Sequence, residues 1–179
     1  MRREHVEHVL RAASQIADDP DVVVIGSQSL LGSLTENQLP VEATASIEVD
    51  VAFFDDPDNT KSDAVDGAIG ELSVFHQTFG YYAQGVSVTT AVLPEGWRNR
   101  IVTLQNSATA PGRGLFLDPH DCVLSKLVAG REKDYAFADA LIAAGLVDLD
   151  VLDGHLDALP ADPLIVDRLR RWITARREA

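Results

Sequence analysis

The sequence predicts an α+β fold with α/β-like order, in which a small mixed β-sheet is flanked by helices and followed by a C-terminal helical bundle. Three observations support this prediction. The run Val22–Ile25 is continuously apolar, which is typical of a strand buried on both faces. Residues 45–53 alternate between the two faces of a strand. From Asp118 to the end, cap residues and apolar spacing indicate successive helices.

The expected elements follow one another with short connections. In order they are a helix near 6–16, a strand at 22–25, a helix beginning at Gly26-Ser27, a loop at 36–44, a strand at 45–53, a helix at 61–72, and strands at 86–93 and 101–104. In the helical part, Asp118 is a good N-cap and Pro119 suits the first helical position. Gly130 and Gly145 are plausible stops for two helices, and two more helices follow, near 148–159 and from 162 onward.

The length of the chain limits the number of cores. With 179 residues it can bury one substantial hydrophobic core, whereas two independent cores would each be small. We therefore expect one structural domain, with a core over residues 1–117 and a helical region over 118–179 packed on it. Hydrophobic residues make up 46% and charged residues 24%, a balance that excludes wholesale disorder.

Membrane and secretion signals are missing from the sequence. No segment approaches the roughly 20 consecutive apolar residues of a membrane helix, and the N-terminal residues lead into mixed polar sequence. We therefore expect a cytoplasmic protein without a membrane partner. Cys122 is the only cysteine, so an internal disulfide and a cysteine zinc cluster are both excluded.

The chain is strongly acidic. Its formal charge is −13, from 15 Lys and Arg against 28 Asp and Glu. A net field of this sign repels nucleic acid at long range, so any polynucleotide partner needs a local basic patch. The arginines that offer material for such a patch are Arg98, Arg100, Arg113, Arg168, Arg170, Arg171, Arg176 and Arg177.

Two acidic side chains share one face of the strand predicted at 45–53. Glu48 and Asp50 are two residues apart, so they point the same way and their oxygens can converge on one or two cations. Mg²⁺ prefers such oxygen ligands and commonly takes one or two carboxylates together with phosphate oxygens and water. Alternating acids on a solvent-facing strand, without any metal, are the alternative.

A candidate anion site precedes the two acids. Gly26 and Ser27 stand between a buried strand and a helix, where backbone N–H groups face an anion and glycine permits close approach of a phosphate. The alternative is that Gly26 only forms a tight turn and that Ser27 only caps the helix.

These motifs resemble the polymerase-β-like nucleotidyltransferase superfamily. Ile25-Gly26-Ser27 and Glu48-Val49-Asp50 match its pattern of a hydrophobic residue, Gly, Gly or Ser, and a later acid-x-acid strand. The segment 126–134 resembles the Lys, Arg and Lys/Arg-Asp motif of the AbiEii/MenT-type toxin nucleotidyltransferases. The resemblance covers about residues 22–139.

The resemblance implies a role for each matched residue. The implied roles are triphosphate contact for Gly26 and Ser27, Mg²⁺ binding for Glu48 and Asp50, contact with nucleotide phosphates for Lys126, a further catalytic acid in Asp134, and phosphate contact or orientation of that acid for Arg131. The implied reaction transfers a nucleotide from an NTP to the 3′ end of tRNA or to another acceptor, with loss of pyrophosphate. The implied biological role is that of a toxin with a cognate antitoxin as partner.

Three features depart from the family pattern. The first acid is Glu48 where Asp is commoner, the gap between Ser27 and Glu48 is long, and the strand predicted at 86–93 carries no acid. The site is therefore either a two-carboxylate version or catalytically inactive. Two alternatives remain: a degenerate fold that binds a nucleotide or a protein, and an enzyme that modifies a small molecule. For Lys126, the alternative is a side chain that extends from an apolar helix into solvent.

Overall fold

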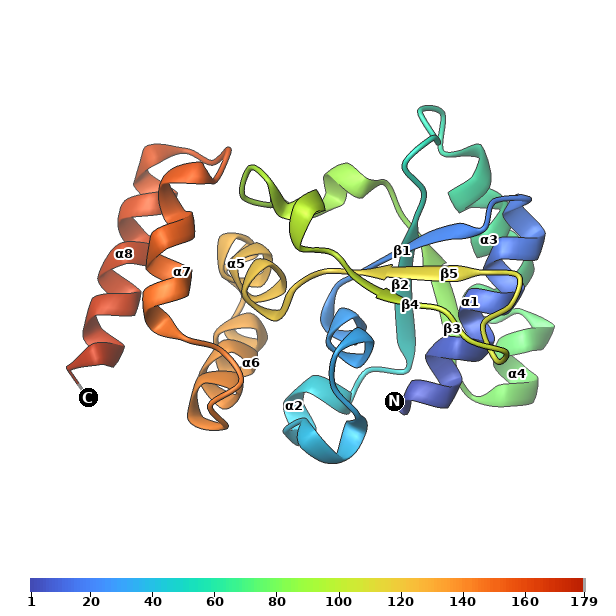
Figure 1. The fold of residues 1–179 in the computed structure, drawn as a ribbon, viewed down its shortest axis with the longest axis horizontal. Helices are drawn as coiled ribbons and strands as arrows, with labels where there is room; N and C mark the ends of the chain where they lie inside the picture. Colours follow the sequence, from blue (N-terminus) through green and yellow to red (C-terminus); the bar gives the residue numbers. More distant parts are fainter. Residues whose placement is uncertain (179) are drawn as a thin grey trace.

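Five short strands form one mixed sheet at the centre of the molecule (Figure 1). The structure is a computed structural model and describes residues 1–178. The strands are β1 Asp21–Ile25, β2 Glu48–Ala52, β3 Tyr82–Gly85, β4 Val102–Leu104 and β5 Arg113–Phe116, in the spatial order β3-β2-β1-β5-β4. β1 is antiparallel to β2 and parallel to β5, β2 is parallel to β3, and β4 is antiparallel to β5.

Helices cover the sheet on both faces, and the C-terminal ones lie on the opposite side from α1 and α3 (Figure 1). The α-helices are α1 Arg3–Ala17, α2 Val41–Thr44, α3 Thr60–Ile69, α4 Val74–Phe79, α5 Pro119–Ala129, α6 Glu132–Ala143, α7 Leu149–His155 and α8 Pro163–Arg177. The 3₁₀ segments are η1 Ser27–Gly32, η2 Glu36–Gln38, η3 Val88–Thr90, η4 Trp97–Arg100 and η5 Leu156–Ala158. The predicted α+β fold, with a mixed sheet and C-terminal helices, is confirmed.

The continuous apolar run in β1 has a physical reason, because both of its faces are buried. Val22 and Val24 pack into a cluster with residues of α1 and α3, whereas Val23 and Ile25 pack with residues of α5, α6, α7 and α8. Each of these side chains is at most 3% exposed. The sheet and the C-terminal helices therefore share one hydrophobic core.

The alternation in β2 places its two acids on a defined face. Val49 and Val51 lie in the cluster with α1 and α3, and Ala52 belongs to the cluster with the C-terminal helices. Since side chains alternate along a strand, Glu48 and Asp50 face the C-terminal helices. Ile47 falls on the face of Val49 and Val51 in the alternating pattern, but it precedes the strand and is 50% exposed.

Two sequence predictions of elements were wrong, the strand at 86–93 and the loop at 36–44, whereas the helix expected from Gly26-Ser27 is present as a 3₁₀ helix. Residues 86–93 contain no strand, because Ser87 Oγ accepts a hydrogen bond from the Thr89 amide and starts the 3₁₀ turn η3. The strand beside β2 is the shorter β3, and β5 was not predicted. The segment after Gly26 is the 3₁₀ helix η1, and the predicted loop 36–44 contains η2 and α2.

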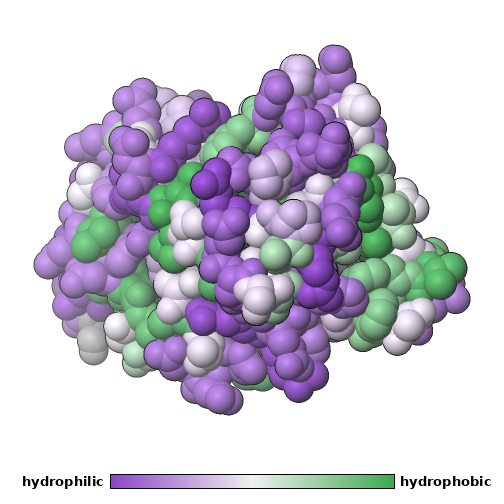
Figure 2. All heavy atoms as spheres, turned by 45° about the vertical axis from the view of Figure 1, so that its right-hand side comes forward, coloured by the Kyte–Doolittle hydropathy of each residue, from purple (hydrophilic) through white to green (hydrophobic). Residues whose placement is uncertain are grey.

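Charged and polar side chains dominate the face shown in Figure 2, with hydrophobic side chains in separate areas. Among the described residues, none of the helices is both long enough and apolar enough to cross a bilayer.

Candidate functional site

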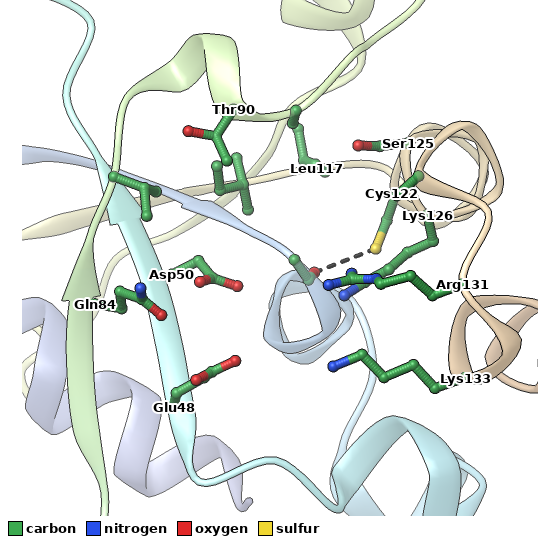
Figure 3. A pocket seen from close by; sticks show the side chains of 15 residues that line it. Glu48, Asp50, Gln84, Thr90, Leu117, Cys122, Ser125, Lys126, Arg131 and Lys133 are labelled. Carbon is green, nitrogen blue, oxygen red and sulfur yellow. Dashed lines mark hydrogen bonds between the residues drawn. The ribbon is translucent and has the colours of Figure 1, made fainter. Parts of the chain in front are cut away.

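A cleft of about 250 Å³ lies between strand β2 and the junction of α5 and α6. One wall carries Glu48 and Asp50 from β2, and the other carries Lys126 from the last turn of α5, Arg131 and Lys133. Figure 3 shows the two acids pointing toward the three cations across the opening. The structure thus brings two segments about 80 residues apart in sequence to one site, with opposite charges on its two sides.

The electrostatics of the acidic wall favour a cation or a proton. Burial, followed by the nearby Glu48 carboxylate, raises the pKa of Asp50 to about 6. The charges of Lys126, Arg131 and Lys133 act in the opposite direction and do not compensate fully. Two carboxylates on one face of a strand, with one of them partly desolvated, are stabilised by a cation that shares their oxygens.

Residue 26 must be a glycine because of its backbone conformation and its close approach to Asp50. Gly26 follows Ile25, the last residue of β1, which pairs with Asp50 on β2. Its φ of +75° and ψ of −166° are almost confined to glycine. A Cβ placed on Gly26 would lie 2.1 Å from Asp50 Oδ2. The Gly26 carbonyl accepts hydrogen bonds from Ser29 Oγ and Cys122 Sγ, at 2.8 and 3.2 Å, which fix the turn against α5.

Replacing Gly26 by Ala is expected to destabilise the protein by about 2–4 kcal/mol, because backbone strain and displacement of Asp50 add. Gly80 offers a control for a positive φ without a steric contact, since it has φ +75° with the left-handed ψ of 11° and its added Cβ meets nothing within 4 Å. The control should lose only about 1 kcal/mol. Urea unfolding of both variants measures the difference, and equal losses would show that Asp50 does not require the glycine.

Ser27 lies at a second hollow that adjoins the cleft. This hollow, of about 470 Å³, shares Glu48, Lys126 and Lys133 with the cleft and is also lined by Ser27 and Asp134. Ser27 is the first residue of η1, and its Oγ accepts a hydrogen bond from the Gln28 amide at 3.4 Å. The serine therefore lines the same hollow as Glu48 and Lys126, whereas it is not among the residues that line the cleft.

Asp134 is buried, with 1% of its surface exposed, and binds Arg131. Its carboxylate accepts hydrogen bonds from Arg131 Nε at 2.7 Å and from Arg131 Nη2 at 3.1 Å. It also accepts one from the Arg131 backbone amide at 3.2 Å. This arrangement starts α6 and directs the guanidinium toward Glu48 and Asp50. In the structure, the acid orients the arginine.

Lys126 and Lys133 differ from most other cations of the chain. Within residues 1–178 neither lysine forms an ion pair, although the chain has a large excess of carboxylates. Most of the arginines that were considered as a possible RNA-binding patch already have partners within the protein. Those that pair with carboxylates are Arg100, Arg113, Arg170, Arg176 and Arg177. Arg168 donates hydrogen bonds to the carbonyls of Leu127 and Val128. The cleft therefore holds two unneutralised cations in an acidic protein.

Comparison with known proteins agrees with this arrangement of charges. Residues 4–164 match the model of the family described as "Nucleotidyltransferase of unknown function (DUF6036)". The chain belongs to this nucleotidyltransferase family. The match includes every residue of the cleft and ends in the first turn of α8. Neither the search of curated proteins nor the search of solved structures returned a match.

Sequence reasoning assigned no role to two polar residues that line the cleft, Lys133 and Gln84, and did not place Tyr82 beside Glu48. Lys133 stood within the Lys, Arg and Lys/Arg-Asp motif, so the motif itself was the signal that could have identified it. Gln84 lies beside Asp50 on β3, and Tyr82 lies beside Glu48. No local signal marked Gln84, because the neighbouring strand was placed at 86–93.

The oxygen donors of the cleft are of the kind that Mg²⁺ binds together with a phosphate ligand. Among the described residues, no group of three or more His, Cys, Asp and Glu is arranged to hold a metal ion by itself. Glu48 and Asp50 supply two carboxylates, and the Gln84 amide lies in register with Asp50. Because Mg²⁺ commonly binds one or two carboxylates and takes its other ligands from phosphates and water, this set is sufficient.

Proposed function

We propose that the chain is a Mg²⁺-dependent nucleotidyltransferase that transfers NMP from an NTP to a hydroxyl group of an acceptor. The observation that carries the proposal is the cleft in which Glu48 and Asp50 face Lys126, Arg131 and Lys133. A triphosphate with its cation needs both kinds of charge, acids for the metal and bases for the phosphate oxygens. The membership of the chain in a nucleotidyltransferase family supports the same reaction.

The reaction forms a bond between the acceptor oxygen and the α-phosphorus and breaks the bond from that phosphorus to pyrophosphate. Glu48 and Asp50 would hold Mg²⁺, whose contribution when bound is neutralisation of charge on the phosphate oxygens. Lys126, Lys133 and Arg131 would bind the phosphate oxygens and orient the triphosphate. Transfer of this kind depends mainly on positioning and on charge stabilisation, which fixed side chains supply.

The acceptor that we propose first is the 3′ end of tRNA, with the protein acting as a toxin that a cognate antitoxin controls. Its support is the resemblance of residues 126–134 to the AbiEii/MenT-type motif. A small-molecule acceptor is the second candidate. The net charge of −13 and the pairing of most surface arginines favour it, because neither feature attracts a polynucleotide.

The test incubates the purified chain with each α-³²P-labelled NTP, with and without Mg²⁺, and with either total tRNA or a panel of small hydroxyl compounds. Label on tRNA supports the first acceptor, and label on a small compound supports the second. Binding of an NTP without turnover on any acceptor would contradict the enzymatic proposal and favour a nucleotide-binding module.

Replacing Lys126 by Ala is expected to lower kcat/KM for NTP by about 10²–10³-fold, because one cation is removed from the transferring phosphates. Lys61 provides a matched control, since it is a lysine whose ammonium pairs with Asp19 at 2.8 Å outside the cleft. The Lys61→Ala variant should stay within about twofold of the parent. Steady-state kinetics of labelled transfer checks both, and equal effects would contradict the role of Lys126.

A further inference from the structure

Tyr82 lies on β3 directly beside Glu48. Its Oη donates a hydrogen bond to Glu48 Oε2 at 2.9 Å, and its backbone amide donates to the Ile47 carbonyl at 3.1 Å. The two residues are also partners in the parallel register of β2 and β3. Hydrogen bonds from both the main chain and the side chain therefore hold Tyr82 next to Glu48.

The surroundings of Tyr82 leave its hydroxyl little freedom. The side chain is largely buried, with 9% of the residue exposed, and its ring lies 4.7 Å from the ring of His76. Burial and the hydrogen bond to Glu48 raise the pKa of Tyr82 to about 12. The phenol therefore keeps its proton and remains a donor throughout the neutral pH range.

The hydrogen bond from Tyr82 restricts the conformation of the Glu48 side chain. Glu48 has one methylene more than the aspartate that is commoner at this position of the superfamily pattern, and so has one more rotatable bond. Tyr82 holds one of its two oxygens, and within residues 1–178 the other oxygen, Oε1, accepts no hydrogen bond. The constraint thus leaves one free carboxylate oxygen beside Asp50.

We propose that Tyr82 is a positioning residue of this nucleotidyltransferase, which holds the longer side chain of Glu48 so that its free oxygen serves the cation site of the cleft. This proposal rests on the proposed function. Residues that hydrogen-bond to metal ligands orient them, and their loss typically lowers metal affinity by about 10–100-fold. Tyr82 would have this effect without touching the cation or the nucleotide.

The first experiment compares Tyr82→Phe with Tyr81→Phe, which removes the same atom from the adjacent residue. Tyr81 has its hydroxyl bonded to His8 at 2.8 Å and packs in the cluster with α1. Binding of Mn²⁺ in the presence of a non-hydrolysable NTP analogue, with each base tried in turn, is measured by isothermal titration calorimetry, and thermal unfolding verifies that both variants fold. We expect Tyr82→Phe to weaken Mn²⁺ binding by about 10–100-fold and Tyr81→Phe by less than about threefold. In transfer assays, the apparent KM for Mg²⁺ should rise while kcat changes little.

A double-mutant cycle with Glu48→Asp distinguishes positioning from general damage to the fold. Shortening Glu48 by one methylene withdraws its carboxylate from Tyr82, so Tyr82→Phe should then change Mn²⁺ affinity by less than about twofold. The same fold-loss in both backgrounds would overturn the positioning role. If the parent binds Mn²⁺ no better than Asp50→Asn, the proposed function itself fails. If the parent binds Mn²⁺ and Tyr82→Phe binds it equally well, only the role of Tyr82 fails.

Discussion

Replacing Asp50 by Asn is expected to reduce nucleotidyl transfer by about 10³-fold or more and, at the same time, to make the protein more stable. The loss follows from the proposed function, in which the Asp50 carboxylate would hold Mg²⁺ against a triphosphate and an amide could not replace its charge. The gain follows because the Asp50 carboxylate is partly desolvated and lies beside Glu48, and this raises its pKa to about 6 from the ordinary 3.8. Opposite changes in activity and stability are typical of residues selected for function.

The sign of the stability change can be derived from the pKa of Asp50. Because the folded protein holds this proton more tightly than the unfolded chain, the associated stabilisation is complete below about pH 4 and is lost as the pH rises through 6. At pH 7.5 the metal-free parent therefore carries an unfavourable charge. Since the Asp50 carboxyl group is only partly buried, we expect the free energy of unfolding of Asp50→Asn to exceed that of the parent by about 1–3 kcal/mol at pH 7.5.

Urea unfolding in EDTA between pH 4 and 8 tests this expectation. The free energy of unfolding of the parent, relative to Asp50→Asn, should fall as the pH rises through 6 and should become flat above pH 7. Added Mg²⁺ with NTP should stabilise the parent and leave the variant unchanged. A variant that is less stable than the parent at pH 7.5, or that transfers label at the parental rate, would contradict the role assigned to Asp50.

Replacing Arg100 by Ala is expected to destabilise the protein by about 3–5 kcal/mol, since it leaves a buried carboxylate without its partner. Asp121 is fully buried in the first turn of α5 and accepts two hydrogen bonds from the Arg100 guanidinium, each at 2.9 Å. His155 is its other basic neighbour, with Nδ1 at 3.6 Å. Urea unfolding at pH 7.5 measures the loss.

Arg113→Ala is the matched control for this change. Arg113 binds Asp21 through the same two-bond geometry, at 2.7 Å for each bond, but their side chains are 44% and 34% exposed. Surface pairs contribute at most about 1 kcal/mol, so burial is the variable that separates the two variants. Equal losses would show that the Arg100 pair is no more important than a surface ion pair.

The sequence predicted those parts of the fold that depend on local pattern. The apolar run of β1, the alternation in β2 and the caps Asp118 and Gly130 each identified their element, because these signals depend on neighbouring residues. Strand β5 is only four residues long, and its position depends on parallel pairing with β1, about 90 residues earlier in the chain. Pairing of this kind leaves no periodic signal in the sequence, and β5 was missed.

In the candidate site, too, local sequence signals could be predicted and long-range strand pairing could not. Gly26, Glu48, Asp50 and the segment 126–134 stood out because their spacing has a chemical meaning within a few residues. Gln84 lies in the site through strand register alone, and residues 86–93 were preferred as the strand because the segment is rich in valine and threonine and ends at Pro94. The structure showed that Ser87 turns this segment away from the sheet.

The common interior of the sheet and the C-terminal helices sets how the cleft can work. Ile25, next to the acids, and Leu127, next to Lys126, are buried in the same cluster and almost fully shielded from water. Moving the basic wall away from the acidic wall would expose this apolar surface, which is unfavourable by roughly 25 cal/mol for each Å². The backbones that carry the two charged walls are therefore held at one separation by the packed interior. For the proposed reaction, we expect discrimination between substrates to come from their shape and charge and not from a large movement of the two walls.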